Sequence, residues 1–167
     1  MTGKMKPPRS VATDIRTIIR ETRPRLMGLS EEHVAEKPYP DKWSLKEILG
    51  HLIDSASTNH QRIVRMQEHP DIGKLGYEQL HWVNSQSYQT EPWSDIVNLW
   101  TSYNIHLAHV VEHVDSGSLA NVCDIDYPKL ATLEYVINDY VRHMRHHLGQ
   151  IFSGADPRKR AEWKEGS

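Results

Sequence analysis

The segment from Ser44 to Glu68 carries the clearest structural signal in the chain. Ser44 and Glu47 form a capping-box pattern, in which the Ser44 hydroxyl meets the Glu47 amide and the Glu47 side chain returns to the Ser44 amide. Apolar residues then recur at helical spacing, and no proline follows before Pro70. A helix over these residues is roughly 37 Å long. Because so long a helix buries its apolar stripe against other elements, the segment favours a helical domain.

Three further segments show the same periodicity. We expect helices over about 11–29, 92–114 and 132–152, with Pro24 kinking the first or shortening it to about Thr22. Residues 69–90 form a connection of a length that is uncommon unless it is functional or holds a short helix, and 119–131 are expected to be loop. We find no alternating pattern typical of strands. The prediction is an all-α, up-down four-helix bundle with a long connection between the second and third helices.

Length and charge narrow the class of protein. The 167 residues fit a single domain, 1–167, with a core over about 11–154 and a charged C-terminal tail, 155–167, that we expect to be frayed. A net charge of −2 argues against general nucleic-acid binding. No apolar run reaches the roughly 18 residues of a membrane span, and we expect no signal peptide. The expected location is cytoplasmic, which the single cysteine, Cys123, fits.

The 11 histidines are the unusual feature of the composition. His143 and His147 lie four residues apart in the last expected helix, so they point the same way and can chelate one metal ion. His146 is rotated by about 100° from His147 and points elsewhere. The alternative for this set is that the histidines are partly buried and hydrogen-bonded. On this pair alone, both interpretations stay open.

The second expected helix supplies a third candidate ligand. His51 lies near the apolar face, where, taken alone, it is better explained as a core histidine with a hydrogen-bond partner. With His143 and His147 it would complete a set of three imidazoles on two packed helices. Such a set leaves coordination positions open, which is typical of catalytic rather than structural sites. Asp54, one turn after His51, is a candidate base or orienting residue.

Carboxylates precede two of these histidines by four residues. Glu47 before His51 and Asp139 before His143 could each orient an imidazole. The alternative is stronger in both cases, because Glu47 already belongs to the capping box and Asp139 suits an exposed i,i+4 pair.

Other candidates carry weaker signals. His106, His109 and His113 in the third expected helix form a competing metal set, but only His109 and His113 have a chelating separation. We interpret these three mainly as surface or interface residues. Trp82 and Tyr88 in the long connection are the aromatic candidates for lining a cofactor pocket. The equal alternative is that they anchor the connection to the bundle.

Two motifs, taken together, resemble those of the DinB/YfiT-like superfamily. They are WSLKEILGHLID, over residues 43–54, and HMRHHLGQI, over residues 143–151. The resemblance extends over about 11–152. It implies an up-down four-helix bundle and a divalent metal ion held by His51, His143 and His147. The ion is nickel, zinc or iron in different members. Leu148 stands where the family usually has an arginine. This difference leaves the ligand set intact, but it makes the substrates of family members harder to assign to this chain.

The resemblance also bounds the function. Several family members are thiol S-transferases that use mycothiol, bacillithiol or glutathione, others are described as metal-dependent hydrolases, and some are dimers. We therefore expect a divalent-metal-binding enzyme that acts on a small-molecule substrate by thiol transfer or hydrolysis. The candidate cofactors are Zn, Ni or Fe and a low-molecular-weight thiol, and Asp54 would assist as base. A homodimer is compatible with the family; neither a nucleic acid nor a membrane is expected as a partner.

Two alternatives stay open at this point. One is a non-catalytic, stress-related bundle that binds a metal or another ligand. The other is a structural interaction bundle whose histidines bind nothing.

Overall fold

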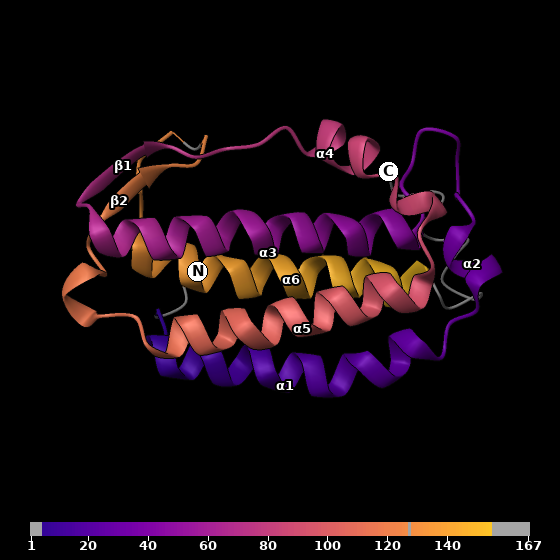
Figure 1. The fold of residues 1–167 in the computed structure, drawn as a ribbon, viewed down its shortest axis with the longest axis horizontal. Coiled ribbons are helices and arrows are strands. Elements are labelled where there is room, and N and C mark those ends of the chain that lie inside the picture. The colour runs from indigo at the N-terminus through magenta and orange to yellow at the C-terminus, as the bar shows by residue number, and fades with distance from the viewer. Residues whose placement is uncertain (1–4, 127, 155–167) are drawn as a thin grey trace.

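The computed structural model describes residues 5–126 and 128–154, and four long helices dominate it (Figure 1). They are α1 (Pro8–Met27), α3 (Leu45–Glu68), α5 (Trp93–Glu112) and α6 (Leu133–Gly154). Shorter helices are α2 (Glu31–Ala35), α4 (Gln79–Gln86) and the 3₁₀ turns η1 (Tyr88–Thr90) and η2 (Ser116–Ser118). The four-helix bundle and its long second connection are thus confirmed.

The long connection after α3 determines how the four helices run. It returns along the length of the bundle before α5 begins, so α3 and α5 run in the same direction and α1 and α6 run in the opposite one (Figure 1). Around the bundle, α1 packs on α5 and α6, and α3 packs on the same two helices. The apolar stripes of all four helices meet in one core, whose largest fully buried side chains include Trp100 and Tyr140.

The start of α3 confirms the capping box. Ser44 is the N-cap, the Glu47 amide donates to its hydroxyl at 3.2 Å, and the Ser44 amide donates to the Glu47 carboxylate at 2.8 Å. These reciprocal bonds satisfy donors that the first turn of a helix leaves without partners.

The expected effect of Pro24 on the first helix is wrong in part. α1 is not shortened to Thr22; it continues through Pro24 to Met27. Tertiary packing explains the difference. Leu26 is fully buried in the core, and the indole Nε1 of Trp93 donates to its carbonyl oxygen at 2.8 Å. The last turn is therefore held by contacts with α5 that a local proline preference does not include.

The expectation of no strands is also wrong. A small sheet of three strands lies at one end of the bundle, in the order β1 (Asp71–Lys74), β2 (Val122–Asp124) and β3 (Ala131–Thr132). β1 pairs with β2 in parallel, and β2 pairs with β3 antiparallel. Strands of two to four residues are too short to show an alternating pattern, so the segment 119–131 looks like loop in the sequence.

Two further expectations concern the chain as a whole. The tail expected to be frayed, 155–167, lies outside the described residues. Within the described part, no helix is both long enough and apolar enough to cross a membrane.

Candidate metal centre

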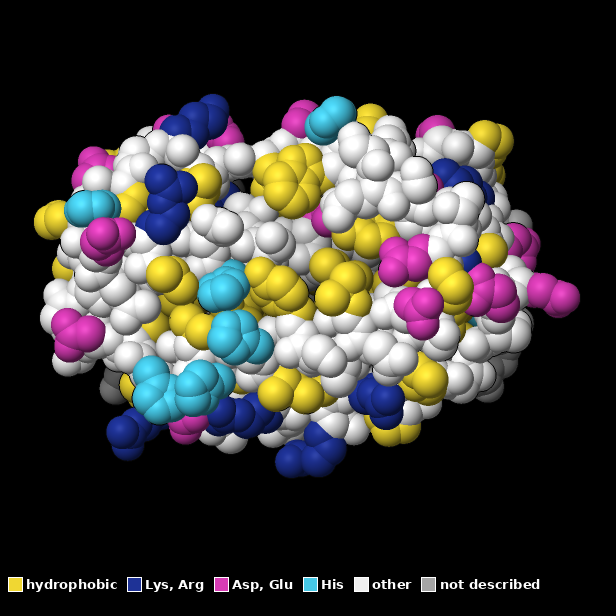
Figure 2. Space-filling view, in the orientation of Figure 1, with side chains coloured by type: hydrophobic (Ala, Val, Ile, Leu, Met, Phe, Trp, Pro, Cys, Tyr) yellow, Lys and Arg dark blue, Asp and Glu magenta, His cyan; other side chains and the backbone are white. Residues whose placement is uncertain are grey.

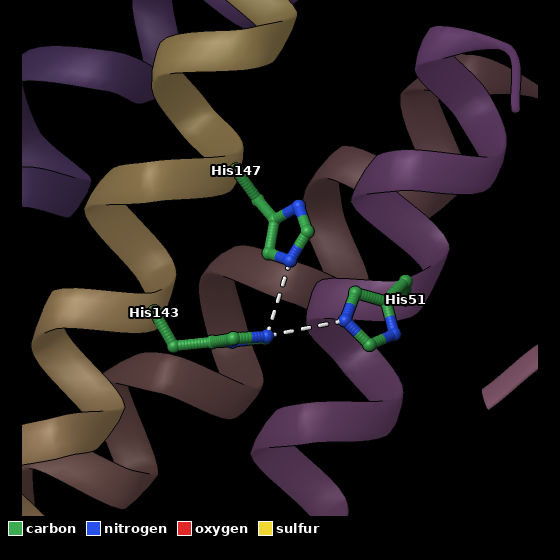
Figure 3. Close-up of side chains that lie close together, drawn as sticks. All are labelled: His51, His143 and His147. Atoms are coloured by element: carbon green, nitrogen blue, oxygen red, sulfur yellow. Dashed lines mark hydrogen bonds between the residues drawn. The ribbon is translucent and has the colours of Figure 1, made fainter. Parts of the chain in front are cut away.

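Three histidines from two neighbouring helices converge on one point (Figure 3). His51 extends from α3, and His143 and His147 extend from consecutive turns of α6. His143 Nε2 lies 3.2 Å from His51 Nε2 and 3.1 Å from His147 Nε2. The structure thus brings together the three residues that the sequence singled out. His146, as expected, is exposed beside them.

The environment keeps these imidazoles neutral. His51 is fully buried, and burial, followed by the neighbouring His143 and His147, lowers its pKa to about 3. Burial and the adjacent His147 lower the pKa of His143 to about 4, and burial also lowers the pKa of His147. Neutral imidazoles present a lone pair, which is the form that binds a metal ion.

The orienting partners of the rings are not the carboxylates considered from the sequence. His143 Nδ1 lies 3.3 Å from Ser55 Oγ, and His147 Nδ1 lies 2.7 Å from Gln150 Oε1. A partner at Nδ1 fixes a ring so that its Nε2 points at the common centre. The ring of His51 is held by packing instead, with its centroid 5.1 Å from that of Trp43.

The alternative interpretation holds for Glu47, and Asp139 is also paired, although with Arg142 three residues further along α6 rather than four. Glu47 caps α3 and pairs with Lys37 at 2.8 Å, while Asp139 accepts a bond from Arg142 Nε at 2.8 Å. Both carboxylates are therefore engaged away from the imidazole rings.

The spacing of the three nitrogens fits a metal ion. Two imidazole nitrogens bound tetrahedrally to zinc at 2.0–2.1 Å lie about 3.3 Å apart. The two measured separations, 3.1 and 3.2 Å, are close to this value, and all three nitrogens lie within 4.8 Å of one another. Three neutral nitrogen donors suit zinc, nickel or iron, and they leave room for a further ligand.

Asp54 lies in a buried hydrogen-bonded network one turn beyond His51. Its Oδ1 accepts bonds from the Tyr88 hydroxyl, at 2.7 Å, and from the Gln86 amide. Its Oδ2 is buried and has no partner among the described residues. Burial raises the pKa of Asp54, and the bonds from Tyr88 and Gln86 oppose this effect. A buried carboxylate with a raised pKa and a free oxygen has the properties of a base.

Two hollows reach the histidine cluster, one at His143 and the other at His147. One is a cavity of about 210 Å³ between α3, α6 and the segment 76–79, and His143 lines it. The other is a more open groove, lined by Trp43, Leu80 and His147 among others. A small molecule in these hollows therefore contacts His143 or His147.

The two aromatic pocket candidates lie near this region but line neither hollow. Tyr88 is buried and packs against α3, and Trp82 is half-buried with its ring 5.1 Å from that of Tyr77. Their role in cofactor binding stays a prediction. The hollows are instead lined by the aromatic rings of Tyr77, Tyr140 and Trp43. In the sequence, Trp43 lies at the start of an expected helix and Tyr140 on an apolar helix face, which favours the core for both, whereas the segment around Tyr77 shows no periodicity and gives no signal.

A second group of histidines lies on the surface. Figure 2 shows histidine side chains gathered over α5 and its surroundings, near the end of the molecule that carries the sheet. His109, Glu112 and His113 lie close enough together to share an ion, and the His60 ring is 5.2 Å from that of His106. In this group, however, Glu112 pairs with Arg16 at 2.6 Å, and His113 Nδ1 contacts the His109 carbonyl at 2.8 Å. It is a more exposed set than the one between α3 and α6.

Comparison with known proteins identifies the family. The model of the DinB superfamily matches residues 15–151, so the chain belongs to this superfamily. It is also similar to a solved structure described as "YfiT from Bacillus subtilis is a probable metal-dependent hydrolase with an unusual four-helix bundle topology". The sequence identity is 15%, the TM-score is 0.78, and the match covers 92% of this chain and 93% of that one. At this identity the similarity shows the fold. No curated protein matches the chain.

Proposed function

We propose that this protein is a metal-dependent enzyme that acts on a small molecule, by hydrolysis or by transfer of a low-molecular-weight thiol. His51, His143 and His147 would hold a divalent ion, with zinc, nickel and iron as the candidates. When bound, such an ion lowers the pKa of a coordinated water or thiol and so supplies a nucleophile near neutral pH.

One observation carries this proposal. His143 Nε2 lies within 3.2 Å of two other imidazole nitrogens at once. A neutral imidazole nitrogen has either one lone pair or one N–H group, so it cannot form a good hydrogen bond with both neighbours. An ion at the common centre would accept a lone pair from each of the three nitrogens. The arrangement is therefore better suited to a metal ion than to a hydrogen-bonded cluster.

The remaining residues support chemistry at that centre. Ser55 and Gln150 hold the rings of His143 and His147 in place, and the two hollows admit a substrate to them. Asp54 is the candidate base, because its Oδ2 has no partner among the described residues and its pKa is raised. Asp54 lines neither hollow, so a proton would reach it through an intervening group such as a water molecule.

Elemental analysis of untagged protein tests the metal site. We expect about one ion per chain in the wild type and its loss in each of His51→Ala, His143→Ala and His147→Ala. The matched control is the double variant His109→Ala/His113→Ala, which removes a histidine pair from the exposed group and should retain the ion. Absence of an ion after reconstitution with Zn²⁺, Ni²⁺ and Fe²⁺ would contradict the proposal.

Substrate panels then test whether the protein is an enzyme. The loaded wild type is assayed against activated esters and amides in water, and against electrophiles with glutathione, mycothiol or bacillithiol. We expect turnover in one panel that disappears in His143→Ala. Full metal occupancy without turnover in either panel would favour the non-catalytic metal-binding bundle.

A further inference from the structure

The cavity beside His143 contains an arginine with unused hydrogen-bonding capacity. Arg62 lies on α3, two turns beyond Ser55, and lines the cavity of about 210 Å³ together with Asn59, Tyr77 and His143. This volume is below the roughly 300–1,000 Å³ of pockets for drug-sized ligands, so the cavity suits a small molecule. A molecule that enters it meets His143, one of the three candidate metal ligands, and the Arg62 side chain in the same space.

The hydrogen bonds of Arg62 leave part of its guanidinium available. Nε and Nη2 both donate to the Leu75 carbonyl oxygen, at 2.9 and 2.6 Å, and Nη1 donates to Asn59 Oδ1 at 3.4 Å. A guanidinium has five N–H donors, so two of them have no partner among the described residues. The three bonds that form also fix the plane of the group.

The charge of Arg62 is likewise uncompensated at contact distance. Two carboxylates line the same cavity, but each pairs with another cation: Asp126 with Lys74, and Asp139 with Arg142. Within the described residues, no carboxylate lies within ion-pair distance of Arg62. A half-buried guanidinium that bonds only to neutral oxygens is a ready partner for an anion, since charge-assisted hydrogen bonds to oxyanions are stronger than those to neutral acceptors.

We infer that Arg62 binds a carboxylate group of the substrate, so that the enzyme acts on small organic acids. The inference rests on the proposed function for its catalytic part, because it places the reacting group near His143 and the carboxylate at Arg62. The charge balance favours a carboxylate over a phosphate. A phosphate dianion would bring two negative charges beside Asp126 and Asp139, whereas a carboxylate brings one.

A comparison of acids with their amides tests this inference directly. Zinc-loaded protein, with its metal content measured first, is titrated by calorimetry with propionate, succinate and glutarate and with the corresponding amides. We expect the wild type to bind at least one of these acids about tenfold or more tightly than its amide, and more tightly than inorganic phosphate. In Arg62→Gln this preference for the acid should disappear, while Arg62→Lys should retain part of it.

Control variants show whether Arg62 binds the carboxylate group, holds the Leu75 carbonyl in place or only contributes positive charge. Arg65→Gln removes one positive charge from an exposed position on the same helix and should change the affinities by less than about twofold. If Arg62 only holds the Leu75 carbonyl in place, Arg62→Gln would weaken acids and amides equally. That result, or a wild type that does not distinguish acid from amide, would overturn the inference.

Failure of this inference is distinguishable from failure of the proposed function. A protein that binds its ion through the three histidines but shows no preference for acids retains the metal centre and loses the carboxylate site. A protein that takes up no metal but still prefers acids through Arg62 retains the carboxylate site and loses the catalytic proposal. A preference for phosphate over every carboxylate would assign the site to a different class of anion and would overturn the inference.

Discussion

Tyr88 occupies the space in which a side chain on Gly50 would lie. A Cβ atom built at Gly50 would be 2.2 Å from Cδ2 of the Tyr88 ring, and that ring is buried. The missing side chain therefore lets the turn η1 pack directly on α3, one residue before His51. The same contact places the Tyr88 hydroxyl 2.7 Å from Asp54.

Replacing Gly50 with alanine should disrupt this contact. We expect Gly50→Ala to lower the free energy of unfolding by about 1–3 kcal/mol, because the ring must move away. The opposite result is expected for Gly149→Ala in α6, because no atom lies within 4 Å of the added Cβ. The higher helix propensity of alanine should raise the free energy of unfolding by up to about 1 kcal/mol. Urea unfolding of both variants checks the pair. Equal stabilisation by the two substitutions would show that Tyr88 does not pack as described.

Removing only the hydroxyl of Tyr88 should affect Asp54 without disturbing the packing. Tyr88→Phe leaves a buried carboxylate with one donor fewer, and we expect it to lower the free energy of unfolding by about 1–3 kcal/mol. A double-mutant cycle with Asp54→Asn isolates the interaction. Additive effects in that cycle would mean that the two groups do not interact in solution.

The partners at Nδ1 should tune metal affinity without supplying ligands. We expect Ser55→Ala and Gln150→Ala each to bind Zn²⁺ about 10- to 100-fold more weakly, while one ion per chain still binds at saturation. Ser57→Ala, on the same helix as Ser55, serves as the control and should leave the affinity unchanged. Competition with a chromophoric chelator measures the affinities, and a drop in the number of ions bound would point to a different role.

The depressed pKa values of the histidines predict how the metal-free protein responds to pH. The unfolded chain binds protons at His51 and His143 below about pH 6.5, whereas the folded protein does not until pH about 3 for His51 and about 4 for His143. Above pH 6.5 these two histidines do not lower the free energy of unfolding. Their destabilising effect grows as the pH falls below 6.5 and reaches its full size below the folded pKa values. The slope approaches about 1.4 kcal/mol per pH unit for each histidine.

Urea unfolding of the metal-free protein between pH 5 and 7 measures this slope. His51→Gln removes one of the titrating groups, so its stability should depend less steeply on pH than that of the wild type. An identical slope in both proteins would show that His51 titrates normally in the folded state.

Much of the bundle and of the histidine cluster follows from local sequence patterns. The Ser44–Glu47 capping box predicts the start of α3, and the four-residue spacing of His143 and His147 predicts that both point the same way. These signals are reliable because helix geometry alone decides which side chains share a face. His51 joins the pair because its position on an apolar face predicts burial against a neighbouring helix.

The features that the sequence does not predict depend on contacts between distant segments. Asp71 pairs with Val122 across about fifty residues in strands too short to show a pattern. In the sequence, Arg62 is an ordinary polar residue of α3. Its special position becomes visible only in the structure, where its guanidinium donates to the Leu75 carbonyl oxygen. Periodicity identifies the buried face of a helix, but it does not say which loop lies over that face.

The connection between α3 and α5 can change in evolution without moving the three imidazoles. The three imidazoles rest on two straight helices, whereas one wall of the cavity comes from the connection that passes over them. Insertions and replacements in that passage would reshape the pocket while the helices hold the imidazoles in register. If the proposed function holds, one set of imidazoles could therefore serve different substrates as the overlying segment is exchanged.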